Sequence, residues 1–157
     1  MSSAILSSGK TIRSVLLHRA QMIPEELYDV QPVPFNNTIK WNLGHIAVVQ
    51  NSILALCSLD VIKLPDSYEE LFKMGTKPAD WTITPPTKDE LLAVLAEQLN
   101  KLSELSPESL EGALPKPIEM GPMRFETVAE LCNFAFIHEA MHAGTISSLV
   151  KVINHNA

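Results

Sequence analysis

The chain has 157 residues, of which 46% are hydrophobic and 19% charged, and its formal net charge is −6. This length suits a single folded domain over residues 1–157, and the composition excludes long disordered segments. The sequence contains no cluster of lysine and arginine, so it lacks the electrostatic signature of a nucleic-acid-binding protein.

Proline placement indicates where helices can form. The 11 prolines leave four long proline-free windows in which apolar residues recur at helical spacing. Thr87 and Glu90 follow Pro85 and Pro86 and have the spacing of a capping box, in which each side chain satisfies a backbone amide of the other residue. Helices are therefore expected at about residues 7–23, 37–59, 87–105 and 125–153. On the first of them, the apolar side is expected to carry Ile12, Val15, Leu16, Met22 and Ile23.

Two connections between these windows are long. Residues 60–86 contain one short helix, expected at about 68–74, and residues 106–124 are rich in proline, glycine and glutamate. Because no segment alternates polar and apolar residues for long, we expect no strands beyond a stray pair. Four amphipathic helices with long crossover loops predict an all-α fold, a four-helix bundle.

The cysteines and the first residues bear on cellular location. Cys57 and Cys132 both lie in apolar helical patterns, which is typical of buried, reduced thiols in a cytosolic protein, and the sequence leaves a disulfide between them open. Residues 1–10 lack the pattern of a signal peptide, and the longest apolar run, 46–59, is too short to span a bilayer. We expect a cytoplasmic protein that binds neither membrane nor nucleic acid.

The most informative residues are His138-Glu139-Ala140-Met141-His142. Two histidines four apart on a helix project about 40° apart and roughly one turn along, so both rings can reach one metal ion. A helical wheel places them in the apolar stripe that faces the bundle core, where unpartnered imidazoles are costly. His45 lies on a similar stripe of the second helix, formed by Thr38, Trp41, Val48, Val49, Ser52 and Leu56.

Together, His45, His138 and His142 are candidate ligands of one divalent metal ion. A set of three neutral histidines leaves the charge of the ion intact and leaves coordination positions for water or substrate. Taken singly, His45 would more often be a hydrogen-bonded core histidine. His18 and His155 are expected to be non-ligands, the first at the edge of its helix and the second in a terminal tail.

The string His138-Glu139-x-x-His142 also matches the zinc-protease signature, with Glu139 as the general base. The context disfavours that interpretation, because Thr145 and Ser148 stand where a metzincin has glycine and histidine. No acidic residue follows Glu139 in the sequence, so a downstream glutamate ligand is not expected. Glu139 itself points about 100° from His138, and we favour a solvated helix residue over a partner of the site.

Three segments carry a resemblance to a known family. They are Asn37-Thr38-Ile39-Lys40-Trp41-Asn42-Leu43-Gly44-His45-Ile46, His138-Glu139-Ala140-Met141-His142-Ala143-Gly144, and the approach to the third helix from Asp80-Trp81 through Pro85-Pro86-Thr87 to Glu90-Leu91-Leu92. On these residues the chain resembles the DinB-like (DinB/YfiT) four-helix-bundle proteins. In that family one histidine of helix two and two of helix four bind a divalent metal, which implies His45, His138 and His142 here.

The resemblance implies nickel or zinc, with iron as a further option, and a small-molecule substrate. Family members include thiol-dependent S-transferases that use bacillithiol or mycothiol, and homodimers are common among them. Two positions depart from the family pattern: Thr145 follows Gly144 in place of glutamine, and Gln50 stands near the place of a glutamate. We expect Gly144, inside a helix, to mark a close helix approach.

Two functions of different class follow. The leading hypothesis is a metal-dependent thiol S-transferase, or a related metal-dependent hydrolase, in which coordination lowers the pKa of a low-molecular-weight thiol or of water. The rival is a non-enzymatic, stress-associated dimeric module with a structural metal, for which Glu139 or His18 would supply a fourth ligand. The sequence assigns no catalytic residue, and the candidate pocket walls are Trp41, Phe134, Tyr68, Phe72 and Trp81.

Overall fold

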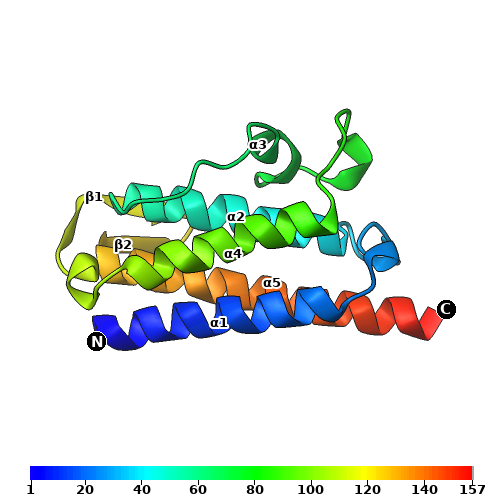
Figure 1. Cartoon of the computed structure of the whole chain (residues 1–157). Coiled ribbons are helices and arrows are strands. Elements are labelled where there is room, and N and C mark those ends of the chain that lie inside the picture. The colour runs from blue at the N-terminus through cyan, green and yellow to red at the C-terminus, as the bar shows by residue number, and fades with distance from the viewer. Residues whose placement is uncertain (157) are drawn as a thin grey trace.

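The computed structural model describes residues 1–156, which form a predominantly helical fold (Figure 1). The helices are α1 (Ser2–Met22), α2 (Ile39–Leu56), α3 (Ser67–Phe72), α4 (Lys88–Glu104) and α5 (Val128–Asn156). Short 3-10 turns lie at Glu25–Leu27, Pro78–Asp80 and Pro107–Leu110, and two strands, β1 (Ala113–Met120) and β2 (Met123–Thr127), form an antiparallel hairpin. The all-α prediction is confirmed, with this hairpin as its stray pair of strands.

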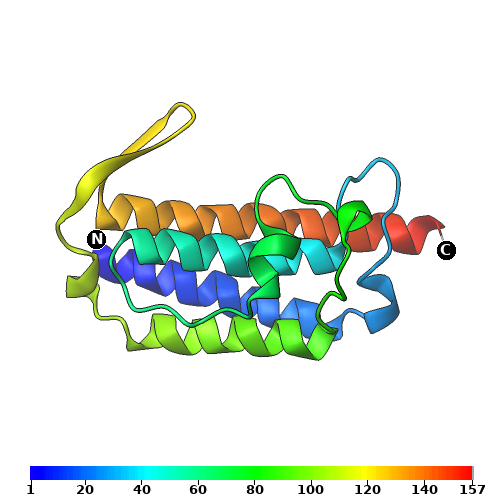
Figure 2. The same ribbon diagram turned by 90° about the horizontal axis from the view of Figure 1, so that it is seen from above.

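The four long helices lie side by side along one axis, and their directions reveal the crossover (Figures 1 and 2). Helices α1 and α5 run one way, whereas α2 and α4 run the other, so the two termini lie at opposite ends of the bundle. The connection 57–87 returns along the whole bundle and carries α3, which packs on α2. In consequence α2 lies against α5, and the predicted metal ligands come from two adjacent helices.

Local sequence signals explain where the helices begin. The Thr38 side chain accepts a hydrogen bond from the amide of Trp41 at the start of α2. Both halves of the expected capping box between Thr87 and Glu90 form at the start of α4. The amide of Glu130 likewise donates to Thr127 Oγ1 and the carboxylate of Glu130 accepts from the amide of Thr127, so a second capping box starts α5.

That second capping box corrects the expected start of the fourth helix. Residues 125–127 belong to strand β2 and not to the helix. The hairpin turns at Gly121, whose φ of +58° suits glycine, and Pro115 and Pro117 lie where the register is irregular. Proline is tolerated in such an edge strand, although in the sequence it reads as a sign of a loop.

The buried face of α1 also differs from the expected one. Its buried residues are Leu6, Gly9, Arg13, Leu16 and Ala20, whereas the expected Val15 and Met22 are 38% and 73% exposed. This stripe has the spacing of three and four residues that a helix face requires, but it contains an arginine. A charged residue in the middle of a buried stripe must have partners, and these partners lie beside the predicted site.

The two cysteines are buried and free, as expected for reduced thiols. The Sγ atoms of Cys57 and Cys132 lie 3.7 Å apart, between the end of α2 and the start of α5. Within residues 1–156, none of the helices combines the length and the apolar character that crossing a membrane requires.

Candidate metal centre

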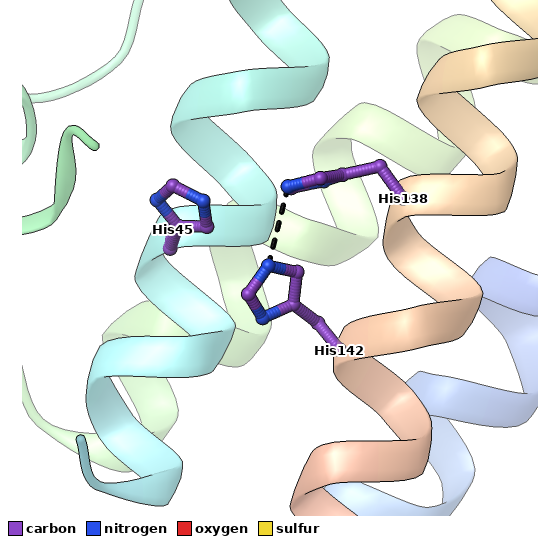
Figure 3. Close-up of side chains that lie close together, drawn as sticks. All are labelled: His45, His138 and His142. Atoms are coloured by element: carbon purple, nitrogen blue, oxygen red, sulfur yellow. Dashed lines mark hydrogen bonds between the residues drawn. The ribbon is translucent and has the colours of Figure 1, made fainter. Parts of the chain in front are cut away.

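The three predicted ligands converge between α2 and α5 (Figure 3). His45 projects from α2, and His138 and His142 project from successive turns of α5 toward it. One ring nitrogen from each histidine belongs to a group of atoms that all lie within 4.8 Å of one another. The Nε2 atoms of His138 and His142 are 3.2 Å apart, close to the separation of about 3.3 Å between two nitrogens on a tetrahedral zinc ion.

Hydrogen bonds at the opposite ring nitrogens orient two of the three rings. The backbone carbonyl oxygen of Phe72 lies 2.7 Å from His45 Nδ1, and because a carbonyl can only accept, this nitrogen carries the proton. Asn42 Oδ1 lies 2.7 Å from His142 Nδ1, and the amide of Asn42 is itself oriented by its donation to the Thr38 carbonyl. Both rings therefore direct the lone pair of Nε2 into the site, the tautomer that metal-binding histidines adopt.

Aromatic packing adds to this orientation. The Trp41 ring stacks on His45 with ring centroids 4.5 Å apart and planes inclined by 13°. Its indole N–H donates to Thr76 Oγ1, in the segment that follows α3. Trp41, which the sequence offered as a pocket wall, thus supports the ring of His45 and does not line the cavity beside the histidines.

Burial keeps the three rings neutral. Loss of solvent contact lowers the pKa of His45 below its usual 6.5. The same desolvation, together with the neighbouring rings, lowers the pKa of His138 to about 4 and that of His142 to about 3. The deprotonated form is the one that binds a metal, so these rings are available to a cation at mildly acidic pH.

A pH dependence of stability follows for the metal-free protein. As pH falls from 6.5 toward 4, histidines of the unfolded chain bind protons that the folded chain does not, so the free energy of unfolding decreases. Urea unfolding across this range should show a steeper loss in the parent than in His142→Gln, because the variant lacks one such ring. Parallel curves for the two proteins would contradict the lowered pKa values.

Gly44 lets α3 approach the turn of α2 that carries His45. A Cβ atom at this position would lie 2.4–2.5 Å from atoms of the Phe72 ring, a contact that side chains do not make. Phe72 is buried, and its carbonyl oxygen is the acceptor for His45. The glycine is therefore required for the contact that orients His45, a role that its place in the sequence before His45 did not reveal.

Gly144 behaves differently from what the sequence predicted. A Cβ atom there would meet no atom within 4 Å, so the expected close helix approach is wrong. We expect Gly44→Ala to destabilise the protein by about 1–2 kcal/mol through overpacking, and Gly144→Ala to stabilise it by up to about 1 kcal/mol through helix propensity. Thermal unfolding of the two variants provides the comparison, and equal effects would contradict the role of Gly44.

Glu139 is not the solvated helix residue that the sequence favoured. It is 1% exposed, and its carboxylate lies on Arg13, with Arg13 Nε 2.7 Å from Oε1 and Nη2 3.0 Å from Oε2. Gln50 Nε2 also donates to Oε2 of Glu139. Since both oxygens are occupied in the bundle core, this carboxylate is unavailable as the general base of a zinc protease.

Arg13 joins all four long helices at one point. Its guanidinium donates to Glu139 on α5, to Gln50 on α2, and to the Leu95 carbonyl and Gln98 side chain on α4. These contacts use all five N–H groups of the fully buried arginine. Gln50, noted in the sequence as a departure from the family pattern, thus has a defined place in the network.

None of the remaining candidates is a metal ligand in the part of the chain that the structure describes. His18 is exposed on α1, and His155 lies in the last turn of α5 and not in a tail. Neither belongs to the metal-competent group found among residues 1–156, and Glu139 does not either. Phe72 and Trp81 pack edge to face against each other, and Tyr68 is buried against Phe72.

A cavity of about 630 Å³ opens beside the histidines, and Phe134 is the expected wall residue that lines it. His45 and His138 line this cavity, and so do residues of the β1–β2 hairpin. Ser52 and Leu56, which continue the His45 stripe along α2, are exposed because they face this space and not the core.

Comparisons with known proteins identify the family and the fold. The family model described as the DinB superfamily matches residues 10–146. The chain belongs to the DinB superfamily. A solved structure of the same fold, titled as the conserved protein of a locus from Enterococcus faecalis, superimposes with a TM-score of 0.60 at 20% sequence identity. That match covers 98% of this DinB-superfamily chain and 95% of the other, and no curated protein matches.

Proposed function

We propose that this DinB-superfamily protein binds one divalent metal ion, nickel or zinc, through His45, His138 and His142, and uses it in thiol S-transfer. The observation that carries the proposal is the convergence of three neutral histidines, two of which have Nδ1 fixed by the Phe72 carbonyl and by Asn42. When bound, the ion would lower the pKa of a thiol or water in a remaining coordination position and supply a nucleophile at neutral pH.

The surroundings of the three histidines favour a thiol over water as that nucleophile. Hydrolysis by the zinc-protease route needs a carboxylate base, and the Glu139 carboxylate is held by Arg13 and Gln50. A thiol has an ordinary pKa near 8.5 and needs less activation than water. The thiol would lose its proton to solvent, and in the transfer the sulfur–carbon bond would form as the bond from carbon to the leaving group breaks, the leaving group departing with that bond's electron pair.

The residues around the three histidines would orient their rings for metal binding. Phe72 and Asn42 hold the rings in the metal-binding tautomer, and Trp41 restricts the rotation of His45 by stacking. Among the described residues no fourth protein ligand joins the three histidines, which supports a site open to substrate over a filled structural one. Assembly as a homodimer is part of the proposal and rests on the family resemblance, whereas the proposed cytoplasmic location rests on the two buried, free cysteines.

A thiol-conjugation assay tests the reaction. Protein purified without metal-affinity chromatography and loaded with zinc or nickel is given cysteine, bacillithiol or mycothiol with monochlorobimane. We expect thiol-dependent turnover in the parent and in His18→Ala, a change at an exposed histidine, and none in His138→Ala. Ester hydrolysis without turnover of any thiol would reject the transferase in favour of the hydrolase.

A further inference from the structure

Most of the side chains that line the cavity beside the three histidines are apolar. Val48, Val49 and Ile53 of α2 form one side, Met120 and Met123 of the hairpin form another, and Phe134 of α5 lies next to His138. The ring centroids of Phe134 and His138 are 6.4 Å apart, so the apolar surface continues up to the proposed metal ligands. At about 630 Å³, the space is of the size that holds a small organic molecule.

Charged groups lie only among the exposed residues that border this space. Glu69 and Lys73 belong to the α3 segment, and Glu119 lies on the hairpin, where Arg124 Nη1 is 2.9 Å from its carboxylate. Two carboxylates against one ammonium and one guanidinium give no excess of positive charge at this border. Apart from the proposed metal ion, a polyanion such as a nucleotide or a coenzyme A derivative would therefore find no electrostatic complement here.

We propose that this cavity binds an uncharged, largely apolar molecule, the electrophilic partner of the thiol, with its reactive carbon directed toward His45 and His138. The identity of this molecule as a substrate rests on the proposed function, whereas its apolar character rests on the lining alone. Methionine side chains of the hairpin adapt to different shapes, so the site suits a class of aliphatic or aromatic molecules more than one compound.

Binding of a neutral fluorophore tests the lining independently of the metal. N-phenylnaphthylamine has no strong metal-binding group, so it should saturate one site per chain in chelator-treated and in zinc-loaded protein. Linear alcohols from butanol to decanol should displace it, with an affinity that rises about threefold to fourfold per methylene group. ATP should displace it poorly from the chelator-treated protein.

Two variants connect the binding to this cavity. Ser52 is exposed and faces the space, so Ser52→Trp should fill it and weaken the fluorophore at least about tenfold, whereas Ser14→Trp, at an exposed position of α1, should leave binding unchanged. Met123→Lys places a charge in the hairpin wall at a residue that is already 39% exposed. It should weaken binding in the same way and serves if Ser52→Trp does not fold.

The outcomes separate the two proposals. Metal binding without saturable fluorophore binding would overturn the cavity proposal and leave the metal site in place. Saturable binding with equal metal content in the parent and His138→Ala would overturn the proposed function and support the apolar site. Displacement from the chelator-treated protein by ATP as effective as that by decanol would overturn the cavity proposal. A binding stoichiometry that falls as protein concentration rises would also overturn the cavity proposal, because a second copy of the chain would then cover the cavity.

Discussion

Glu139→Ala is expected to destabilise the protein by about 3–5 kcal/mol, because it leaves the Arg13 guanidinium charged, fully buried and without its carboxylate. For a chain of this length the loss corresponds to a fall in melting temperature on the order of 10 °C. Urea or thermal unfolding followed by circular dichroism measures it. Glu97→Ala, at an exposed glutamate within α4, is the matched control and should change stability by less than about 0.5 kcal/mol.

A double variant shows whether the charge pair is the cause. Arg13→Met combined with Glu139→Leu removes both charges together, so it should cost much less than the sum of the two single changes. Gln50 and Gln98 lose partners in the double variant, and some destabilisation therefore remains. Additive effects of the two changes would contradict a direct coupling between Arg13 and Glu139.

Replacing any one of His45, His138 or His142 by alanine is expected to weaken binding of zinc or nickel by about a hundredfold or more. Three ligands from two helices hold the ion in the proposed site, and two remaining imidazoles hold it only weakly. Isothermal titration with each metal, and elemental analysis of protein purified without a metal-affinity step, measure the loss. His18→Ala should bind as the parent does, because His18 lies outside the group.

The orientation of His142 can be tested in the same titrations. Asn42→Ala removes the acceptor for His142 Nδ1 and leaves all three ligands in place, so metal affinity should fall about tenfold to a hundredfold. Circular dichroism of the metal-free variant distinguishes this effect from unfolding. Unchanged affinity would show that Asn42 does not set the tautomer.

The network around Arg13 and the three histidines lie on neighbouring sides of the same turns of α5. Glu139 is adjacent to His138 in sequence, but its carboxylate is directed to Arg13 of α1 and Gln50 of α2. The two histidines of α5 face His45 of α2. One segment thus serves the core and the site at once. The string His138-Glu139-x-x-His142 therefore resembles a protease signature, but only its two histidines are placed to bind a metal ion. Its glutamate has a structural role.

Much of the fold could be predicted because helix formation is local. Proline-free windows with helical spacing gave all four long helices, and the Thr87 and Glu90 pair gave the start of α4. The same kind of signal, Thr127 with Glu130, marks the start of α5, but the preceding strand β2 was absorbed into the expected helix. The hairpin depends on pairing between two segments, and its prolines are typical of a loop, so the sequence did not predict it.

By itself the sequence determined that His45, His138 and His142 face inward from helices, because the direction of a side chain on a helix follows from its position in the repeat. Only the tertiary structure decided what surrounds them. The acceptors for His45 and His142 come from residues 27 and 100 positions away, and the partner of Glu139 lies 126 positions away. A buried charge or an oriented ring gains its stability from such distant neighbours, and helical periodicity contains no information about which helices meet.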